Sequence, residues 1–455
     1  MTRPSADGPR RRAGRLIDRL KRGELDGLEE LSILFGTDPP DINHAHADAA
    51  VYALARCFES HFLSSADAPT ERDRTLVWLG LNVAWDLMYA RVRIHAPLAE
   101  RGIVPILRAC DEHWQALATL GSADDRAALV DARGVVARFA CVISTRLADL
   151  AVLGDLMPRL TPKLLAVAAE LLDGAEMNVW LGVQGLRRQD ARVHREMSSA
   201  QALTAALRTV RLFAKYEPAR VALCTPVATS ALGCLVKKLG DWASRPASHD
   251  EPGTIANAGY ASELVDILRC LSAADGGPTR LMRIGATQPL AAILRGPLSV
   301  QLVVPLAAGV YEARHTLRAD AAAALTPLAK LEGSSGRAAR ADLWAKRVPH
   351  AALRVILDPV TDAFLAKNVA MSHKHEVECA AVLAHALLTD VGGMTSALKA
   401  AHAALRVDLY AAVGHPFVPC KERALLEEAL ACFDVPSPAA VRFAGTTWAW
   451  WRPWN

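Results

Sequence analysis

Two distant segments of the chain carry the same succession of structural signals. Residues 75–113 have the sequence TLVWLGLNVAWDLMYARVRIHAPLAERGIVPILRACDEH, and residues 263–296 have the sequence ELVDILRCLSAADGGPTRLMRIGATQPLAAILRG. Each predicts a long helix, a short linker, a glycine turn at Gly102 or Gly285, and a helix with proline in its first turn, where the missing N–H costs nothing. The glycine permits a positive φ between two helices. Such units expose apolar faces that only their neighbours cover, so they stack.

The rest of the chain shows the same helical periodicity. Apolar residues return at three- and four-residue spacing from Leu16 onward, and almost no stretch alternates apolar and polar residues as a strand does. Weaker copies of the repeated unit occupy residues 135–165, 202–239 and 377–405. The sequence therefore predicts an all-α protein, with an irregular α-helical bundle as the alternative to stacked repeats.

The order of helix, glycine turn and helix resembles the armadillo repeat, whose pattern is similar to ALxNLA…IxxxGAIPxLVxLL. The glycine turns at Gly102, Gly154, Gly285 and Gly393 are irregularly spaced, and some intervals exceed the ~40–47 residues of armadillo or HEAT units. The repeats are therefore degenerate, with insertions. The resemblance implies a right-handed α-solenoid of stacked, degenerate armadillo-like repeats over residues 14–445.

Three segments are expected to stand apart from the repeats. Residues 1–13 form a basic arm with too little apolar surface to order itself, so we expect disorder there. The polar interruption at residues 240–259 is a candidate hinge loop between two halves. Residues 446–455 form a Trp-rich C-terminal tail.

In armadillo proteins the third helix of each repeat lines a concave groove that holds extended peptides. Importin-like repeats place a Trp there with an Asn four residues later. Here Trp85 is followed by Tyr89 at the Asn position, and the second copy supplies Asp266 and Cys270. The resemblance therefore implies a groove lined by Trp85, Tyr89 and Asp266 that holds some segment other than a nuclear signal. Core packing of Trp85 is the alternative.

Both termini carry candidate interaction residues. Trp448, Trp450, Trp451 and Trp454 lie beside Arg452, and this apolar segment either caps the last helices or docks a partner. The N-terminal arm carries Arg10, Arg11, Arg12 and Arg15, which suit a nuclear-import signal or a phosphate-contacting patch; a solvated basic tail is the alternative.

Charge and composition narrow the classes of partner. The chain has 52 Lys and Arg against 48 Asp and Glu, so its net charge of +4 is too near neutral for a nucleic-acid-binding surface as a whole. Nine cysteines without a CxxC pair indicate reduced core thiols. No apolar segment follows the N-terminal charges, and the uncharged runs of 16 residues are shorter than a bilayer span of about 20. We expect an intracellular protein, cytoplasmic or nuclear, without membrane contact.

The sequence offers little for catalysis. His373, His375, Glu376 and Cys379 approach the HExxH zinc-protease pattern but place Cys where the second His belongs, and a structural zinc with His385 is the remaining alternative. No GxSxG, GxxxxGK[ST] or GxGxxG motif occurs.

We therefore expect no catalysis, no cofactor and no metal. The expected function is a scaffold or adaptor that binds a peptide or helical segment of a protein partner in the concave groove. A nucleic-acid-associated or nuclear adaptor that uses the basic arm is the first alternative, and an enzyme regulated through the scaffold is the second.

Overall fold

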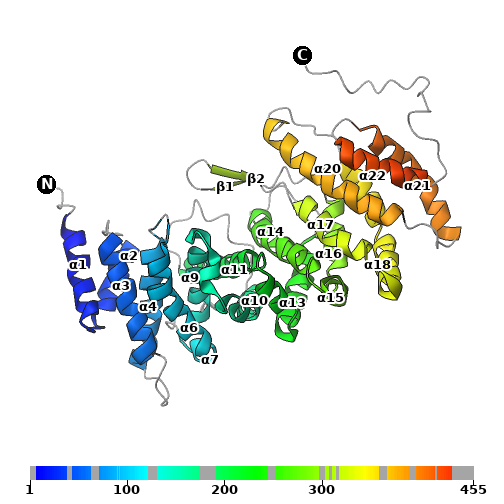
Figure 1. Ribbon diagram of the computed structural model, residues 1–455. Helices are drawn as coiled ribbons and strands as arrows, with labels where there is room; N and C mark the ends of the chain where they lie inside the picture. Colours follow the sequence, from blue (N-terminus) through cyan, green and yellow to red (C-terminus); the bar gives the residue numbers. More distant parts are fainter. Residues whose placement is uncertain are drawn as a thin grey trace. The chain divides into compact units, whose positions relative to one another are not determined.

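The computed structural model is helical throughout its described residues, apart from one short β-hairpin (Figure 1). It describes residues 7–37, 44–62, 71–89, 91, 93–120, 131–174, 191–243, 253–296, 303–306, 310–313, 317–357, 366–389, 396–415 and 418–432. The chain divides into two compact units, Met1–Arg280 and Leu281–Asn455. The all-α prediction is thus confirmed over the described residues, with the hairpin as a local exception.

The first unit holds the N-terminal helices. They are α1 (Asp7–Lys21), α2 (Gly27–Thr37), α3 (His44–Cys57), α4 (Glu71–Tyr89), α5 (Ala96–Leu98), α6 (Val104–Glu112), α7 (Trp114–Leu117), α9 (Ala132–Arg146), α10 (Leu156–Gly174), α11 (Ala191–Phe213), α12 (Glu217–Leu223), α13 (Pro226–Ala243) and α14 (Gly253–Ser272). Short helical turns lie at Phe58–Phe62, Ala99–Ile103 and Leu150–Leu153. Helix α15 (Gly277–Arg283) crosses the boundary between the units.

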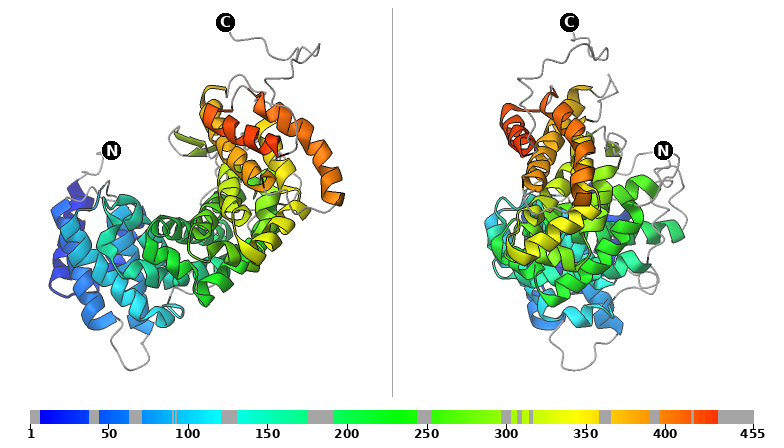
Figure 2. Two further views of the ribbon diagram at one scale, coloured as in Figure 1. Left: turned by 45° about the vertical axis from the view of Figure 1, so that its right-hand side comes forward. Right: turned by 90° about the vertical axis from the view of Figure 1, so that its right-hand side faces the viewer.

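Most helices of the first unit pack in two rows that lie side by side. One row consists of α2, α4, α9, α11 and α14, each in contact with the next, and the other consists of α1, α3, α6, α10 and α13 (Figures 1 and 2). Each helix of the first row also contacts a helix of the second: α2 with α1, α4 with α3, α9 with α6, α11 with α10, and α14 with α13. Apolar side chains fill the space between the rows, and Leu81, Phe139 and Leu164 are fully buried.

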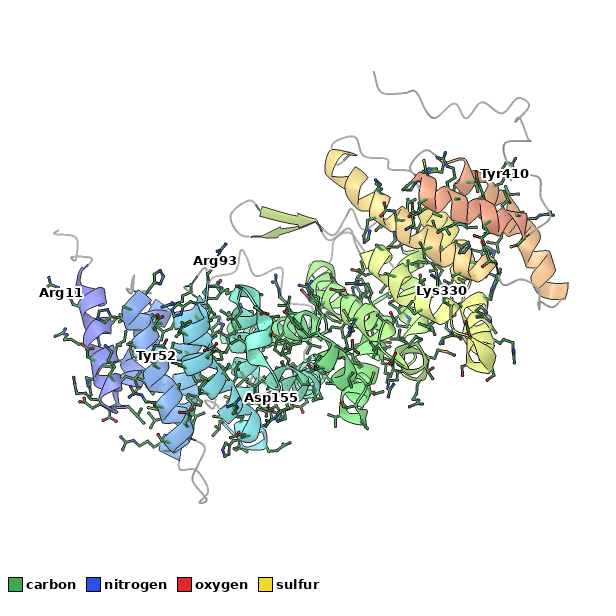
Figure 3. All side chains as sticks on the ribbon, in the orientation of Figure 1. Arg11, Tyr52, Arg93, Asp155, Lys330 and Tyr410 are labelled. Atoms are coloured by element: carbon green, nitrogen blue, oxygen red, sulfur yellow. The ribbon has the colours of Figure 1, made fainter. Side chains whose placement is uncertain are left out.

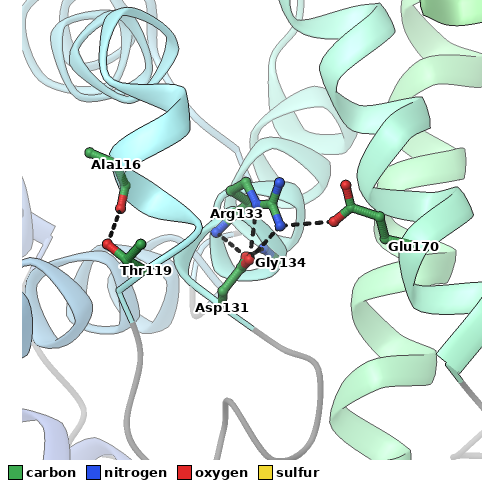
Figure 4. A network of polar contacts seen from close by, with 6 residues as sticks. All are labelled: Ala116, Thr119, Asp131, Arg133, Gly134 and Glu170. Carbon is green, nitrogen blue, oxygen red and sulfur yellow. Dashed lines mark hydrogen bonds and ion pairs between the residues drawn. The ribbon is translucent and has the colours of Figure 1, made fainter.

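Polar contacts at the start of α9 connect the two rows. Asp131 caps the helix, because its Oδ1 accepts hydrogen bonds from the backbone N–H of Arg133 at 2.8 Å and of Gly134 at 3.4 Å. The Arg133 side chain returns to Asp131 Oδ2 at 2.7 Å and reaches Glu170 of α10 at 2.8 Å (Figure 4). Nearby, the Thr119 hydroxyl donates to the Ala116 carbonyl at 2.9 Å, after the end of α7 (Figure 4).

The second row of helices contains a buried carboxylate. The side chain of Asp111 in α6 is fully buried and pairs with Arg159 and Lys163 of α10, with Lys163 Nζ 2.6 Å from Asp111 Oδ1. Lys163 also lies 5.8 Å from the ring centroid of Trp114. Because a buried carboxylate needs charged partners, this cluster fixes how α6 and α10 meet.

The predicted glycine turns have two different physical causes. Gly154 and Gly285 adopt positive φ, at 50° and 76°, as expected. Gly102 does not, and the expectation is wrong there. A Cβ on Gly102 would lie 2.8 Å from Cγ1 of Val51 in α3, so close packing requires glycine at this position. Gly393 lies outside the described residues.

The second unit is a separate helical body. It contains α16 (Thr287–Arg295), β1 (Val303–Leu306), β2 (Val310–Ala313), α17 (Leu317–Ala329), α18 (Gly333–Ala345), α19 (Val348–Leu357), α20 (Ala366–Leu388), α21 (Ser396–Val413) and α22 (Cys420–Ala431). The strands are antiparallel, with Val303 opposite Ala313 and Leu306 opposite Val310. Helix α20 packs against α17, α19 and α22.

A buried ion pair joins two helices of this second unit. Arg318 of α17 and Glu376 of α20 are 2% and 1% exposed, and their side chains approach to 2.8 Å. Arg318 Nη1 also donates to the Gly296 carbonyl at 3.4 Å. Each charge of the pair thus has a buried partner of opposite sign.

The N-terminal boundary differs from the expected one. Helix α1 begins at Asp7, so residues 7–13 of the supposed disordered arm are helical. Ala13 is fully buried, and Arg12 pairs with Glu30 of α2 at 3.0 Å. The arm orders because it continues the apolar face that Leu16 and Leu20 begin.

Two further expected boundaries concern the middle and the end of the chain. Helix α13 extends to Ala243 and α14 begins at Gly253, so much of the expected hinge loop at 240–259 belongs to helices, and residues 244–252 lie outside the described residues. The boundary between the compact units falls at Arg280 instead. The Trp-rich tail at 446–455 also lies outside the described residues.

Two further sequence expectations concern the cysteines and membrane spans. All nine cysteines are free, and Cys57 and Cys110 are buried as expected, but Cys234, Cys420 and Cys432 are exposed. Cys234 lies within α13, Cys420 begins α22 and Cys432 directly follows its end, so the core assignment is wrong for these three. Within the described residues no single helix is long and apolar enough to cross a bilayer, although α12 and α13 would pass that test jointly as a pair bent by 71°.

Candidate functional site

Four neighbouring helices of the first row are each open to solvent along one stripe. In α9, for example, Val135, Val136 and Phe139 are buried, whereas Arg138 and Cys141 are partly exposed. We call the open residues of α4, α9, α11 and α14, with the carboxylates that pair with them, the stripe surface. It comprises Asn82, Trp85, Asp86, Tyr89, Arg138, Cys141, Arg146, Arg208, Arg211, Glu263, Asp266 and Arg269.

Aromatic and arginine side chains connect the stripes of α4 and α9. The rings of Trp85 and Tyr89 lie one helical turn apart, with centroids 5.3 Å apart and planes inclined by 34°. The guanidinium carbon of Arg138 is 5.3 Å from the Trp85 centroid, and that of Arg146 is 5.4 Å from the Tyr89 centroid. This geometry is that of paired cation–π contacts.

Arg146 also completes the end of α4. Its Nη1 donates to the carbonyl of Met88 at 2.9 Å and to the carbonyl of Tyr89. These carbonyls belong to the last turn of α4, where backbone acceptors have no partner within the helix. Arg146 therefore fixes the position of Tyr89, whose side chain is 59% exposed.

Asp86 places a carboxyl group among these side chains. Burial raises the pKa of Asp86 to about 6, and the nearby Arg138 guanidinium opposes that rise. The carboxyl group consequently changes charge in the range just below neutral pH.

The stripes of α9, α11 and α14 are connected by charged groups. Arg211 of α11 pairs with Glu263 of α14 at 2.5 Å and with Asp266 at 3.5 Å, and Arg269 Nε donates to Asp266 at 2.9 Å. Burial raises the pKa of the Cys141 thiol, while Arg208 acts in the opposite direction and Glu263 adds to the rise. Cys141 of α9 therefore lies in the electrostatic field of both α11 and α14.

Arg208 differs from its neighbours on the stripe surface. No carboxylate among the described residues forms an ion pair with its guanidinium, whereas its Nε, like those of Arg138 and Arg211, is buried without a hydrogen-bond partner. Arg211, one turn further along α11, has two carboxylate partners. The stripe surface therefore carries a fixed positive charge at its centre.

The three residues expected to line a groove lie on helices of one row. Trp85 and Tyr89 are on α4, where Tyr89 is exposed and Trp85 is partly exposed, and Asp266 is on α14. Asp266 is 9% exposed and engaged by Arg211 and Arg269, which makes it a structural partner of the arginines.

Sequence reasoning missed the arginines of α9 and α11. Arg208 and Arg211 have the three-residue spacing that places side chains on one helix face, and Arg138 falls in the weaker copy at residues 135–165. The spacing of Arg208 and Arg211 was the sequence signal that could have placed both on one face of the helix. Asn82, whose Nδ2 donates to the Trp78 carbonyl at 3.0 Å, was also missed.

The basic arm and the Trp-rich tail lie away from the stripe surface or outside the described residues. Arg11, Arg12 and Arg15 are exposed on α1, and Figure 3 labels Arg11 on that helix. The side chain of Arg10 lies outside the described residues, as do Trp448, Trp450, Trp451 and Trp454.

The zinc alternative finds no support in the geometry of α20. Glu376 points into the core and pairs with Arg318, whereas the exposed His375 has its Nε2 3.9 Å from Cys379 Sγ. His385 pairs with Glu428 of α22 at 3.1 Å. No three His, Cys, Asp or Glu side chains within the described residues are placed to hold a metal ion.

Comparisons with known proteins identify no family for this chain. No family model matches the sequence, and no curated protein matches it either. Among solved structures, the chain is similar to a crystal structure described as an engineered protein, at 13% identity, over 93% of this chain and 99% of that chain, with a TM-score of 0.32. A TM-score this low supports no argument about fold or function.

Proposed function

We propose that this protein is a non-catalytic interaction scaffold that binds an extended segment of a protein partner across the stripe surface. The observation that carries the proposal is that polar and aromatic side chains connect neighbouring helices of one row: Trp85 of α4 with Arg138 of α9, and Arg211 of α11 with Asp266 of α14. We infer a degenerate armadillo-like solenoid for the first unit from the same two rows of helices.

The size of the stripe surface suits an extended segment. Packed helices lie about 8–10 Å apart, so four of them in a row extend over roughly 30 Å. An extended chain rises about 3.3 Å per residue, so about nine residues would cross all four helices. A segment of this length meets each stripe in turn.

The side chains of the stripe surface are those that anchor protein partners. Trp, Tyr and Arg are enriched among residues that dominate binding energy, and Tyr89 is well exposed beside the stacked Arg146. The rings are already held by arginines, so binding requires little further ordering of these side chains.

The chemistry of the stripe surface favours binding over catalysis. Cys141 of α9 and Cys270 of α14 are both partly exposed, and burial raises the pKa of both thiols, which disfavours the nucleophilic thiolate. Asp86 has a raised pKa of about 6 but lies beside arginines and aromatic rings rather than beside a nucleophile.

A second candidate function uses α1. Arg11 and Arg15 are exposed on this helix, and they favour an adaptor that contacts phosphates. Arg12 is already engaged with Glu30, which reduces the charge available there.

The test is affinity capture from the source cells in the presence of nuclease. The intact chain is compared with Tyr89→Ala and Trp85→Ala/Tyr89→Ala variants whose folding is verified by circular dichroism and thermal unfolding. A Val221→Ala/Val227→Ala variant is the matched control, because these apolar residues are 58% and 59% exposed on α12 and α13. The proposal expects a protein partner that is lost with the aromatic variants and kept with the control. The proposal would be contradicted by partners that nuclease removes, or by partners that the Tyr89→Ala variant captures as well as the intact chain does.

A further inference from the structure

The centre of the stripe surface carries a guanidinium whose charge is not balanced locally. Arg208 has no ion pair among the described residues, and its Nε is buried without a hydrogen-bond partner. The flanking arginines are occupied: Arg211 by Glu263 and Asp266, and Arg269 by Asp266. Arg208 can therefore bind an anion, and no carboxylate of the described residues occupies that position.

The position of Arg208 limits which anion it can receive. Arg208 lies on α11, which packs against α9, and its charge acts on the Cys141 thiol of α9. A planar guanidinium binds a carboxylate through two parallel hydrogen bonds, and a partly buried site strengthens them.

We propose that the bound segment is acidic and that Arg208 receives one of its carboxylates; this inference rests on the proposed function of the stripe surface. The segment crosses α4, α9 and α11 in an extended conformation, with an apolar or aromatic side chain against Tyr89 and acidic side chains against the arginines. Arg208 is the specificity-determining residue for this charge.

The mixed charge of the stripe surface favours a peptide over a nucleic acid. Asp86, Glu263 and Asp266 lie among the arginines, so an unbroken run of phosphates would meet carboxylates along its path. A peptide avoids this repulsion, because its acidic residues can be spaced to match the arginines and its other positions can be neutral.

Helix spacing predicts the spacing of the acidic residues. Arg138 and Arg208 lie on neighbouring helices, which pack about 8–10 Å apart. In the polyproline II conformation three residues advance the chain by about 9 Å and return to the same side. Acidic residues three positions apart therefore face Arg138 and Arg208 together.

The test selects a displayed library of random peptides, each about 12 residues long, on the full chain; that length exceeds the roughly nine residues needed to cross the four helices. The selected peptides are then measured by fluorescence anisotropy against four proteins: the intact chain, Arg208→Gln, Tyr89→Ala, and Arg108→Gln as the control. Arg108 is half-exposed on α6, in the other row of the first unit, so its loss removes the same charge elsewhere.

The expected result is enrichment of peptides with acidic residues three apart. Their affinity should fall at least tenfold with Arg208→Gln and with Tyr89→Ala, and stay unchanged with Arg108→Gln. In a selected peptide, replacing the acidic residue that faces Arg208 by Lys should abolish binding to the intact chain. The same Lys peptide should bind the Arg208→Glu variant.

Other outcomes separate the two proposals. Neutral or basic peptides that need Tyr89 but not Arg208 would overturn the acidic segment and leave the scaffold function standing. Failure to enrich any peptide that depends on the stripe surface would overturn both. A labelled single-stranded oligonucleotide that binds through Arg208, where no peptide does, would replace the peptide by nucleic acid.

Discussion

The guanidinium of Arg138 lies over the indole ring of Trp85, with 5.3 Å between the guanidinium carbon and the ring centroid. The two residues are on different helices, α9 and α4, and 53 positions apart in the sequence. Their contact connects α4 to α9, and further along the same row Arg211 connects α11 to Asp266 of α14.

The Trp85–Arg138 contact should be measurable as a coupling energy. A double-mutant cycle with Trp85→Leu and Arg138→Gln, followed by urea unfolding, should give about 0.5–1 kcal/mol of favourable coupling, as expected for a partly exposed cation–π pair. The pair Trp85→Leu with Arg108→Gln is the control and should be additive. Additivity in both cycles would show that the stacked geometry contributes no stability.

Asp86 should make stability depend on pH. Its folded pKa of about 6 is above the ordinary aspartate pKa of 3.8, so the folded state holds this proton more tightly than the unfolded state. The free energy of unfolding should therefore fall as pH rises from 4 to 7, by at most about 3 kcal/mol from this group.

The variant Asp86→Asn removes this titration. At pH 7 it should be more stable than the intact chain by about 2 kcal/mol, and at pH 4 the two should differ much less. Urea unfolding at both pH values measures the difference. Parallel pH profiles for the two proteins would contradict the assignment to Asp86.

Gly102 and Gly285 should respond differently to alanine, because they are glycine for different reasons. Gly102→Ala places a Cβ against Val51, which should cost about 1–3 kcal/mol, and the added change Val51→Ala should recover part of that. Gly285→Ala strains a backbone with φ of 76° and should cost about 1–2 kcal/mol, with no help from Val51→Ala. If Val51→Ala recovered the same amount of stability in Gly102→Ala and in Gly285→Ala, this distinction would be contradicted.

The buried pair of Arg318 and Glu376 should be sensitive to the loss of one partner. Glu376→Gln leaves the guanidinium of Arg318 buried without its counterion, so we expect a loss of about 3–5 kcal/mol. Replacing both residues together, as Arg318→Met/Glu376→Leu, should be much less costly. A double variant as unstable as the single one would show that the charges themselves are required.

The sequence predicts some elements of this structure well because their signals are local. Helical periodicity predicts the helices, and the glycines at 154 and 285 predict turns with positive φ. The resemblance to armadillo repeats implies that Trp85 and Tyr89 share a surface, and their ring centroids lie 5.3 Å apart on α4. The hairpin at 303–313 was missed, since its short β-branched segments are surrounded by helical patterns.

Other features depend on contacts between distant parts of the chain. Arg208 looks like any helical arginine in sequence, and its isolation follows from Arg211 taking the carboxylates of α14, more than 50 positions away. The order of residues 7–13 likewise depends on Glu30 of α2 and on a shared apolar core. The similar sequence segments at 75–113 and 263–296 do not reveal these relationships, because their polar residues differ.

Site-specific photo-crosslinking at position 89 tests the central claim most directly. A photoreactive phenylalanine analogue replaces Tyr89, and in a matched chain it replaces Val227, a residue of similar exposure on α13. After irradiation in the source cells and nuclease treatment, the crosslinked segments are sequenced by mass spectrometry. We predict that position 89 joins to an extended, acidic protein segment and that position 227 does not. Equal crosslinking from both positions, or adducts that nuclease removes, would contradict a protein-binding surface on α4, α9, α11 and α14.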